Sequence, residues 1–124
     1  MAPDFNKKTI ETLGRRADHR CSNPDCRIST VGPNEDPKKA TVLGEAAPIT
    51  GARPSSARFD PALNDAARAS ITNAIWLCRN CHRLVDSDEQ RFPTSALYAW
   101  REKHENYVRS SLGSPTDEIA LDLE

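Results

Sequence analysis

Four cysteines fall into two pairs whose spacing is typical of a metal cage. Cys21 and Cys26 are separated by four residues. Cys78 and Cys81 are separated by two. Each pair lies on a short turn, so the two pairs together supply four thiolates for a tetrahedral Zn²⁺ at about 2.3 Å. Because the ion would close a long loop, it would stabilise a small core. The alternatives are two disulfides or free buried thiols, which a chain without a secretion signal disfavours.

A second group of metal-binding side chains follows the second cysteine pair. His82 comes directly after Cys81, and Asp86 lies four residues later, one helical turn along. An imidazole and a carboxylate on one face suit Mg²⁺, Mn²⁺ or Ni²⁺. Asn73, nine residues before His82, carries an amide that could orient a catalytic imidazole. The alternatives are that His82 only borders the zinc, that Asp86 is a surface carboxylate and that Asn73 ends a turn.

The elements that must position these groups are short helices and strands, a pattern that favours an α+β fold. A helix after the second cysteine pair would place His82 and Asp86 on one face. Gly113 is expected to close the last helix, which Thr94 would cap. We expect helices over 7–18, 79–87 and 94–112, a helix starting at Asp60-Pro61, a strand over 75–77, and a hairpin that pairs 28–31 with 40–46.

The charge distribution permits contact with nucleic acid without demonstrating it. The net charge is −1, but residues 111–124 hold four acids and no base, which leaves 17 basic against 14 acidic residues before them. A mildly positive body with an acidic end is compatible with DNA binding. No apolar run has the length of a signal peptide or a membrane span, so we expect a cytoplasmic protein without a membrane partner.

Three stretches of the chain resemble the HNH endonucleases of the ββα-metal fold: GEAAPITGARP, SITNAIWLCRNCHRLVD and RFPTSALYAWREKHE. The resemblance covers about residues 15–108 and is greatest to the N-terminal HNH domain of HNH–SAVED effectors, nucleases of antiphage (CBASS) defence that a cyclic oligonucleotide activates. It implies a small zinc-stabilised ββα-metal domain with flanking helices over 1–112. Residues 113–124 would be an acidic linker or truncated end that leads to a sensor domain.

The resemblance also implies roles for individual residues in cleaving double-stranded DNA. His82 would bind the catalytic ion, Mg²⁺ or another divalent metal, with Asp86 as a second ligand. Asn73 would orient the general base. Arg53 and Arg58 would contact DNA phosphates, although they are equally compatible with solvated loop charges. The active form would be a homo-oligomer, assembled when the sensor domain binds its cyclic oligonucleotide.

Position 48 departs from the family pattern, because Pro48 stands where the family has its general-base histidine. Proline has no titratable group, and general-base assistance is worth about 10²–10⁴ in rate. We therefore expect an endonuclease whose hydrolysis is impaired. The alternative is a non-catalytic zinc module for DNA binding or self-assembly. A redox-sensing zinc knuckle is a third hypothesis.

Overall fold

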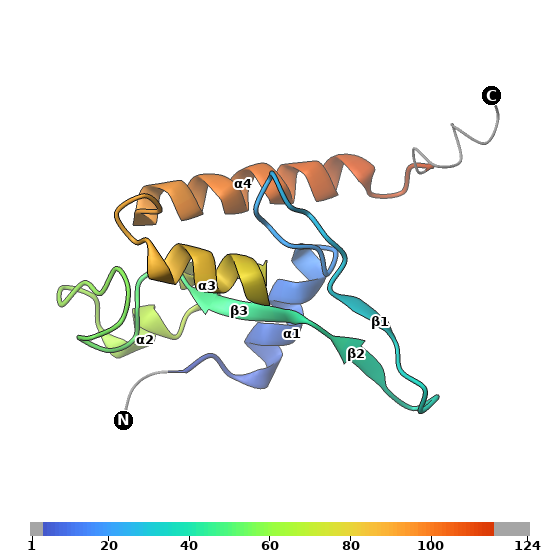
Figure 1. The fold of residues 1–124 in the computed structure, drawn as a ribbon, viewed down its shortest axis with the longest axis horizontal. Coiled ribbons are helices and arrows are strands. Elements are labelled where there is room, and N and C mark those ends of the chain that lie inside the picture. The colour runs from blue at the N-terminus through green and yellow to red at the C-terminus, as the bar shows by residue number, and fades with distance from the viewer. Residues whose placement is uncertain (1–3, 116–124) are drawn as a thin grey trace.

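The computed structural model describes residues 4–115 and shows a mixed α+β chain with two small antiparallel sheets (Figure 1). Within that range no helix is long and apolar enough to cross a membrane. Residues 116–124 of the predicted acidic linker lie outside the described residues. The elements are α1 (Lys7–Arg16), β1 (Val31–Pro33), β2 (Ala40–Val42), β3 (Gly44–Pro48), α2 (Asp65–Arg68), a 3₁₀ turn η1 (Ile71–Asn73), β4 (Ala74–Cys78), α3 (Arg79–Ser87) and α4 (Thr94–Ser111).

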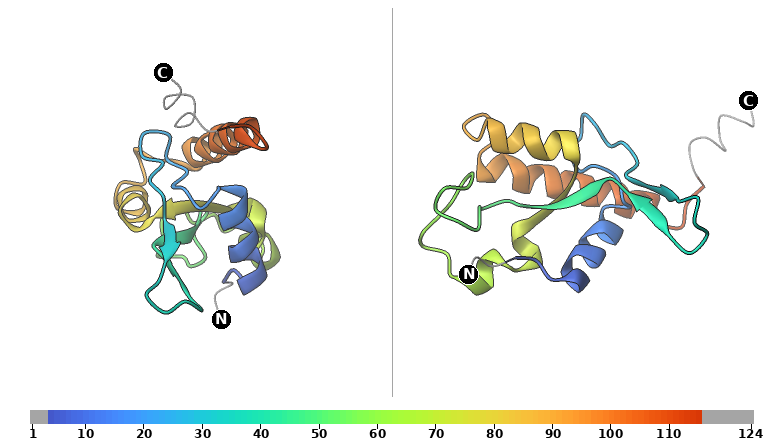
Figure 2. Two further views of the ribbon diagram at one scale, coloured as in Figure 1. Left: turned by 90° about the vertical axis from the view of Figure 1, so that its right-hand side faces the viewer. Right: turned by 60° about the horizontal axis from the view of Figure 1, so that its bottom comes forward.

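The β3–β4 sheet is the centre of the fold, and its two faces pack against different helices. Every residue of β4 is buried. Because side chains alternate along a strand, Ile75 and Leu77 pack into one cluster with Val85 of α3, while Trp76 packs with Leu13 of α1 in another. Figures 1 and 2 show α1 on one side of this sheet and α3 and α4 on the other. Burying each large apolar side chain contributes about 1.5–3 kcal/mol.

A close approach between Gly44 and Trp76 fixes where β3 enters the sheet. A Cβ atom on Gly44 would lie 2.3 Å from the indole ring, so only glycine fits without a shift of the ring. The indole Nε1 donates a hydrogen bond of 3.0 Å to Oγ1 of Thr30. Trp76 therefore connects the central strand to the segment that follows the first cysteine pair.

The pairing of the strands differs from the predicted hairpin. β1 pairs with β2 in the register Val31 to Val42, and this hairpin extends away from the rest of the chain (Figure 1). Residues 44–48 pair with β4 instead, in the register Gly44 to Cys78. The physical reason is that β4 is apolar along its length, and the backbone groups of such a buried strand need a partner.

The helices predicted over 7–18 and 94–112 are confirmed, with shifted ends. Asn6 caps α1 by accepting a 2.8 Å hydrogen bond from the Thr9 amide. α4 ends at Ser111, and Gly113 follows with a φ of +73°, the left-handed conformation that commonly closes a helix. The predicted Thr94 cap is wrong: Thr94 is the first helical residue, and the cap position makes no side-chain hydrogen bond.

The predicted helix start at Asp60-Pro61 is also wrong. The carboxylate of Asp60 accepts a hydrogen bond from the Ala62 amide and forms a turn rather than a helix cap. The helix begins at Asp65 and is four residues long. Asn64 caps it by accepting a 2.8 Å hydrogen bond from the Ala67 amide, so the better-placed amide side chain determines the start.

Candidate functional site

The four cysteines come together at one end of the β3–β4 sheet. Their sulfur atoms all lie within 4.8 Å of one another, and the sulfurs of Cys26 and Cys78 are 4.0 Å apart. In a tetrahedral site with Zn–S distances of about 2.3 Å the sulfurs are about 3.8 Å apart. All four residues are free cysteines, which argues against the two disulfides. The cluster is therefore close enough to hold one metal ion and is compatible with structural zinc.

Local turns present the sulfurs of this cluster. In the first pair, the side chain of Asn23 accepts a 3.0 Å hydrogen bond from the Asp25 amide, which shapes the turn. In the second pair, Cys78 ends β4 and its sulfur caps α3 by accepting from the Cys81 amide at 3.4 Å. The Asn23 amide also donates to the sulfur of Cys81 at 3.4 Å. Such donors stabilise the thiolate form that a metal requires.

Burial and hydrogen bonding act in opposite directions on the thiol pKa values. Burial raises the pKa of Cys81 to about 11 and raises the pKa of Cys21 further. Burial acts on the pKa of Cys78 in the same direction, but the hydrogen bonds it accepts from Cys81, Cys21 and Cys26 lower that pKa on balance. Buried thiols of this kind are held as thiolates by a bound cation, whose charge replaces the lost solvation.

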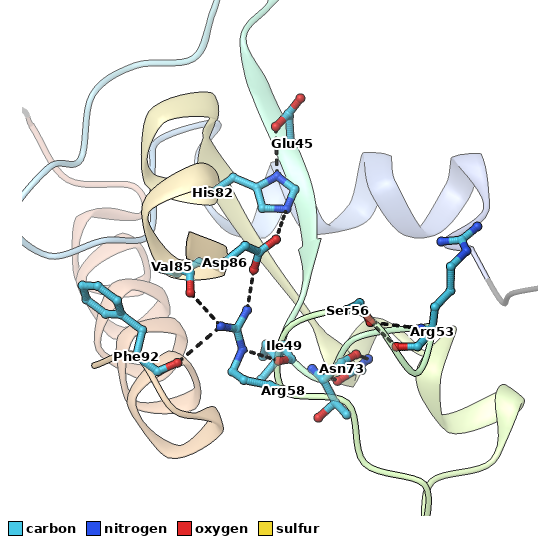
Figure 3. Close-up of polar contacts among 11 residues, drawn as sticks. Glu45, Ile49, Arg53, Ser56, Arg58, Asn73, His82, Val85, Asp86 and Phe92 are labelled. Carbon is cyan, nitrogen blue, oxygen red and sulfur yellow. Dashed lines mark hydrogen bonds and ion pairs between the residues drawn. The ribbon is translucent and has the colours of Figure 1, made fainter. Parts of the chain in front are cut away.

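His82 and Asp86 lie on α3 (Figure 3), which also carries Cys81 of the cysteine cluster. The ring of His82 lies between two carboxylates: Nδ1 is 2.9 Å from Oε1 of Glu45 on β3, and Nε2 is 3.2 Å from Oδ2 of Asp86. The structure thus brings together His82 and Asp86, as the sequence predicts. It adds Glu45, whose carboxylate contacts Nδ1, the ring nitrogen that faces away from Asp86.

Arg58 holds the other side of the Asp86 carboxylate. Its guanidinium lies 2.7 Å from Oδ1 of Asp86 and donates to the carbonyls of Ile49 at 2.7 Å and Val85 at 2.9 Å, with Phe92 more distant at 3.4 Å. The side chain is only 4% exposed. The backbone of Arg58 has a φ of +58°, in the left-handed region, which costs a non-glycine residue about 1 kcal/mol or more.

Arg58 therefore departs from the predicted role of contacting DNA phosphates. Four of the five N–H donors of its guanidinium go to a carboxylate and three carbonyls, and the side chain is 4% exposed, so it offers little to a phosphate. Arg53, from the same loop, is exposed, and Figure 3 shows its guanidinium pointing away from Asp86. Ser56 fixes the backbone of Arg53 through hydrogen bonds of 3.0 and 2.5 Å and leaves the side chain free. A phosphate contact by Arg53 stays a prediction.

The network determines the protonation of its members. The hydrogen bond to Asp86 raises the pKa of His82, burial opposes this, and Glu45 adds to the rise. Burial acts to raise the pKa of Asp86, but hydrogen bonds from His82 and Arg58 bring that pKa below its ordinary value. Without a cation at this site, the contacts with the two carboxylates therefore favour the protonated form of the His82 ring.

The same geometry fits a divalent ion held by His82 and Asp86. Two ligands of one octahedral ion at about 2.1 Å lie about 3 Å apart, and Nε2 and Oδ2 are 3.2 Å apart. Glu45 on Nδ1 would fix the ring so that Nε2 faces the ion, which is how carboxylates commonly orient metal-binding histidines. An ion here would displace the proton on Nε2.

Pro48 lies at the end of β3, opposite Ala74, and costs the sheet no hydrogen bond. The Ile49 amide donates to the Asn73 carbonyl at 2.8 Å. Because hydrogen-bonded and non-bonded pairs alternate in an antiparallel sheet, Pro48 and Ala74 form a non-bonded pair. The nitrogen of Pro48 thus faces away from β4, a position that tolerates proline.

Asn73 is buried, and its amide bonds to backbone rather than to position 48. It accepts from the Thr50 amide at 2.9 Å and donates to the carbonyls of Thr50 at 2.9 Å and Arg68 at 3.0 Å. The amide thus holds the chain two residues beyond Pro48. This differs from the expected hydrogen bond to a base: Asn73 fixes the end of β3 through its backbone.

Two hollows meet at His82 and Asp86. The first, which we call the α3 groove, has a volume of about 760 Å³ and is lined by Glu45, Arg79, Asn80, His82, Arg83 and Asp86. The second, which we call the strand-end cavity, has a volume of about 400 Å³ and includes Pro48, Arg53, Ser56, Arg68, His82 and Asp86. Position 48 thus shares a cavity with the histidine and the carboxylate.

The remaining histidines lie elsewhere. His104 on α4 is fully buried and donates from Nε2 to the Ala17 carbonyl at 2.9 Å, so it packs α4 against α1. His19 packs edge-on against Trp76. Neither borders the α3 groove or the strand-end cavity.

The sequence reasoning did not foresee the two contacts that hold the site, Glu45 to His82 and Arg58 to Asp86. Glu45 is the acid of a strand that is otherwise small and apolar, and this isolated charge was the available indication. Arg58 gives no comparable indication, since an arginine in a loop ordinarily faces solvent.

Comparisons of the chain with known protein families and with curated proteins give no match.

Proposed function

We propose that this chain is a metal-dependent DNA endonuclease domain of the HNH type, impaired by proline at the general-base position. The observation that carries the proposal is the unit formed by β3, β4 and α3. It exposes His82 and Asp86 in one cavity with position 48, directly beside a four-cysteine cluster. The resemblance to HNH nucleases rests on the same residues.

Two metal sites with different duties follow from this proposal. The four cysteines hold a structural zinc with no open position, since four thiolates complete a tetrahedral shell. His82 and Asp86 hold the catalytic ion, Mg²⁺ or another divalent metal. That ion, when bound, supplies positive charge at the scissile phosphate and the leaving oxygen.

The chain's own residues prepare the second site. Glu45 fixes the tautomer of His82 so that Nε2 faces the cavity. Arg58 keeps Asp86 anionic and takes up Oδ1, so that Oδ2 is the oxygen directed at the ion. Asn73 holds the backbone beyond β3 and thereby fixes the position of residue 48.

Pro48 leaves no group in the cavity's base position to take a proton from water. The reaction therefore loses the contribution of about 10²–10⁴ in rate that a general base supplies. The chain retains the metal ligands and the fold, so binding of DNA and of metal continues while cleavage is slow.

The wider setting is proposed from the resemblance alone. The domain belongs to a cytoplasmic antiphage effector in which a cyclic oligonucleotide binds a separate sensor domain. That binding brings nuclease domains together as a homo-oligomer on double-stranded DNA.

The alternative function is a non-catalytic zinc module for DNA binding or self-assembly. Two observations favour it: position 48 carries no titratable group, and both oxygens of Asp86 already have partners within the protein. Under this alternative the network of His82 and Asp86 only stabilises the fold.

Metal titration separates the two functions without relying on cleavage. Zinc-loaded protein is titrated with Mn²⁺ and bound Mn²⁺ is measured by electron paramagnetic resonance. We expect one Mn²⁺ per chain, lost in His82→Ala and in Asp86→Asn, with zinc content unchanged in both. Equal Mn²⁺ binding by these variants and the unaltered chain would contradict the proposed site. Loss of zinc from His82→Ala would show that the histidine belongs to the cysteine cluster.

A further inference from the structure

The arginines of this chain divide into those that the fold uses and those that it leaves free. Arg58 and Arg68 are paired with carboxylates and 4% and 11% exposed in their side chains. Arg53 and Arg83 are exposed and make no ion pair within the part of the chain that the structure describes. Arg79 is 74% exposed and lies 4.0 Å from Glu45, at the limit of an ion pair.

Three exposed arginines line the two hollows that meet at the His82–Asp86 pair. Arg79 and Arg83 line the α3 groove, and Arg53 lines the strand-end cavity. Both hollows are bordered by His82 and Asp86, so they adjoin each other at these two side chains.

The spacing of Arg79 and Arg83 suits a chain of phosphates. They are four residues apart on α3, so they share a face and are separated by about 6 Å along the helix axis. Exposed guanidiniums of this kind suit phosphates, because each can form two parallel hydrogen bonds to the phosphate oxygens. The carboxylates of Glu45 and Asp86 would repel phosphates from this groove, and the arginines at its rim offset that repulsion.

We propose that one strand of a DNA duplex crosses both hollows, with phosphates at Arg79 and Arg83 on one side of His82–Asp86 and a phosphate at Arg53 on the other. This inference rests on the proposed function for the identity of the ligand and extends it by assigning the path of the strand. In the role of phosphate contacts, two arginines of α3 take the place of Arg58, whose side chain is buried and bonded within the fold. Binding then requires phosphates on both sides of the phosphodiester bond that lies at His82.

The test is the salt dependence of DNA binding, measured on the chain with Pro48 in place so that cleavage does not interfere. A fluorescent DNA duplex is titrated in Mg²⁺ at salt concentrations from 50 to 200 mM, and affinity is followed by anisotropy. Arg83→Gln and Arg53→Gln are each compared with Arg15→Gln. Arg15 is also exposed and without an ion pair in the described range, but it lines a different hollow, between α1 and α4.

Each lost phosphate contact should lower the magnitude of the log–log salt slope by about 0.9. Between 50 and 200 mM salt the unaltered chain should therefore lose about 3.5-fold more affinity than Arg83→Gln or Arg53→Gln. Arg15→Gln carries the same change in net charge and should keep the slope. Arg83→Lys, which keeps the positive charge, should have the salt slope of the unaltered chain.

Equal slopes for Arg83→Gln, Arg53→Gln and Arg15→Gln would overturn the assigned path, as would absence of duplex binding by the unaltered chain at 50 mM salt. These outcomes are distinct from failure of the proposed function. Altered slopes in a protein that no substitution at position 48 makes active would keep the path and favour the zinc module. Cleavage restored at position 48 with unaffected slopes would keep the nuclease and remove the path.

Discussion

Substituting Arg58 by alanine tests whether this residue holds the candidate site together. The substitution removes hydrogen bonds to the carbonyls of Ile49 and Val85, a weaker one to Phe92, and the ion pair with Asp86. Each good hydrogen bond contributes about 1 kcal/mol. The ion pair is partly screened because Asp86 is 39% exposed, so it contributes about 1 kcal/mol or less. Together these contacts amount to about 3 kcal/mol.

The free energy of unfolding is measured in urea at a constant excess of zinc, so that loss of metal does not enter the comparison. Arg58→Ala should lower it by about 3 kcal/mol. Asp86→Asn removes the ion pair with Arg58 and the contact with His82 but keeps the carbonyl hydrogen bonds of Arg58, and it should cost about 1–2 kcal/mol. Arg53→Ala, an exposed arginine of the same loop, serves as the control and should stay within about 0.5 kcal/mol of the unaltered chain. A cost below about 1 kcal/mol for Arg58→Ala would refute this reasoning.

Three further substitutions or titrations test other parts of the structure. Cys78→Ser should abolish the single bound zinc seen by native mass spectrometry and remove the cooperative melting transition; retained zinc would exclude this residue from the cage. Gly44→Ala should lower the free energy of unfolding by about 1–3 kcal/mol, because its Cβ would meet the Trp76 ring at 2.3 Å; an unchanged urea midpoint would contradict this contact. Burial lowers the pKa of His104, so its contribution to stability is present above the ordinary value of 6.5 and lost as pH falls toward the folded pKa. An NMR titration of the ring should have its midpoint below 6.5, whereas a midpoint above this value would indicate a solvated ring.

The parts of the site that depend on neighbouring residues were predictable from the sequence. The spacing of each cysteine pair specifies a turn, and the two turns do bring four sulfurs within 4.8 Å. The helix over 79–87 was predicted with its observed ends, because its polar and apolar positions follow helical periodicity. That helix places His82 and Asp86 on one face, as expected from their spacing of four residues.

The parts that depend on distant residues were not predictable in the same way. The hairpin prediction paired strands across the shortest turn, whereas β3 pairs with β4, whose residues lie about thirty positions further along. The burial of Arg58 depends on carbonyls from three separate segments. Such contacts are made only once the chain has folded, and no local pattern in the sequence reports them.

The measurement that tests the central claim most directly is cleavage of plasmid DNA by Pro48→His. Asn73 holds the end of β3, so a histidine at position 48 would enter the cavity that His82 and Asp86 already border. We predict metal-dependent nicking or linearisation with Mg²⁺, Mn²⁺ or Ni²⁺, as a monomer or after enforced dimerisation. The unaltered chain should cleave about 10²–10⁴ more slowly.

The control is Pro48→His combined with His82→Ala, which should be inactive while keeping its zinc. Brisk cleavage by the unaltered chain would show that the general base lies at another residue. If Pro48→His stays inert with each of the three ions, including as an enforced dimer, the endonuclease proposal is contradicted and the zinc-module function takes its place.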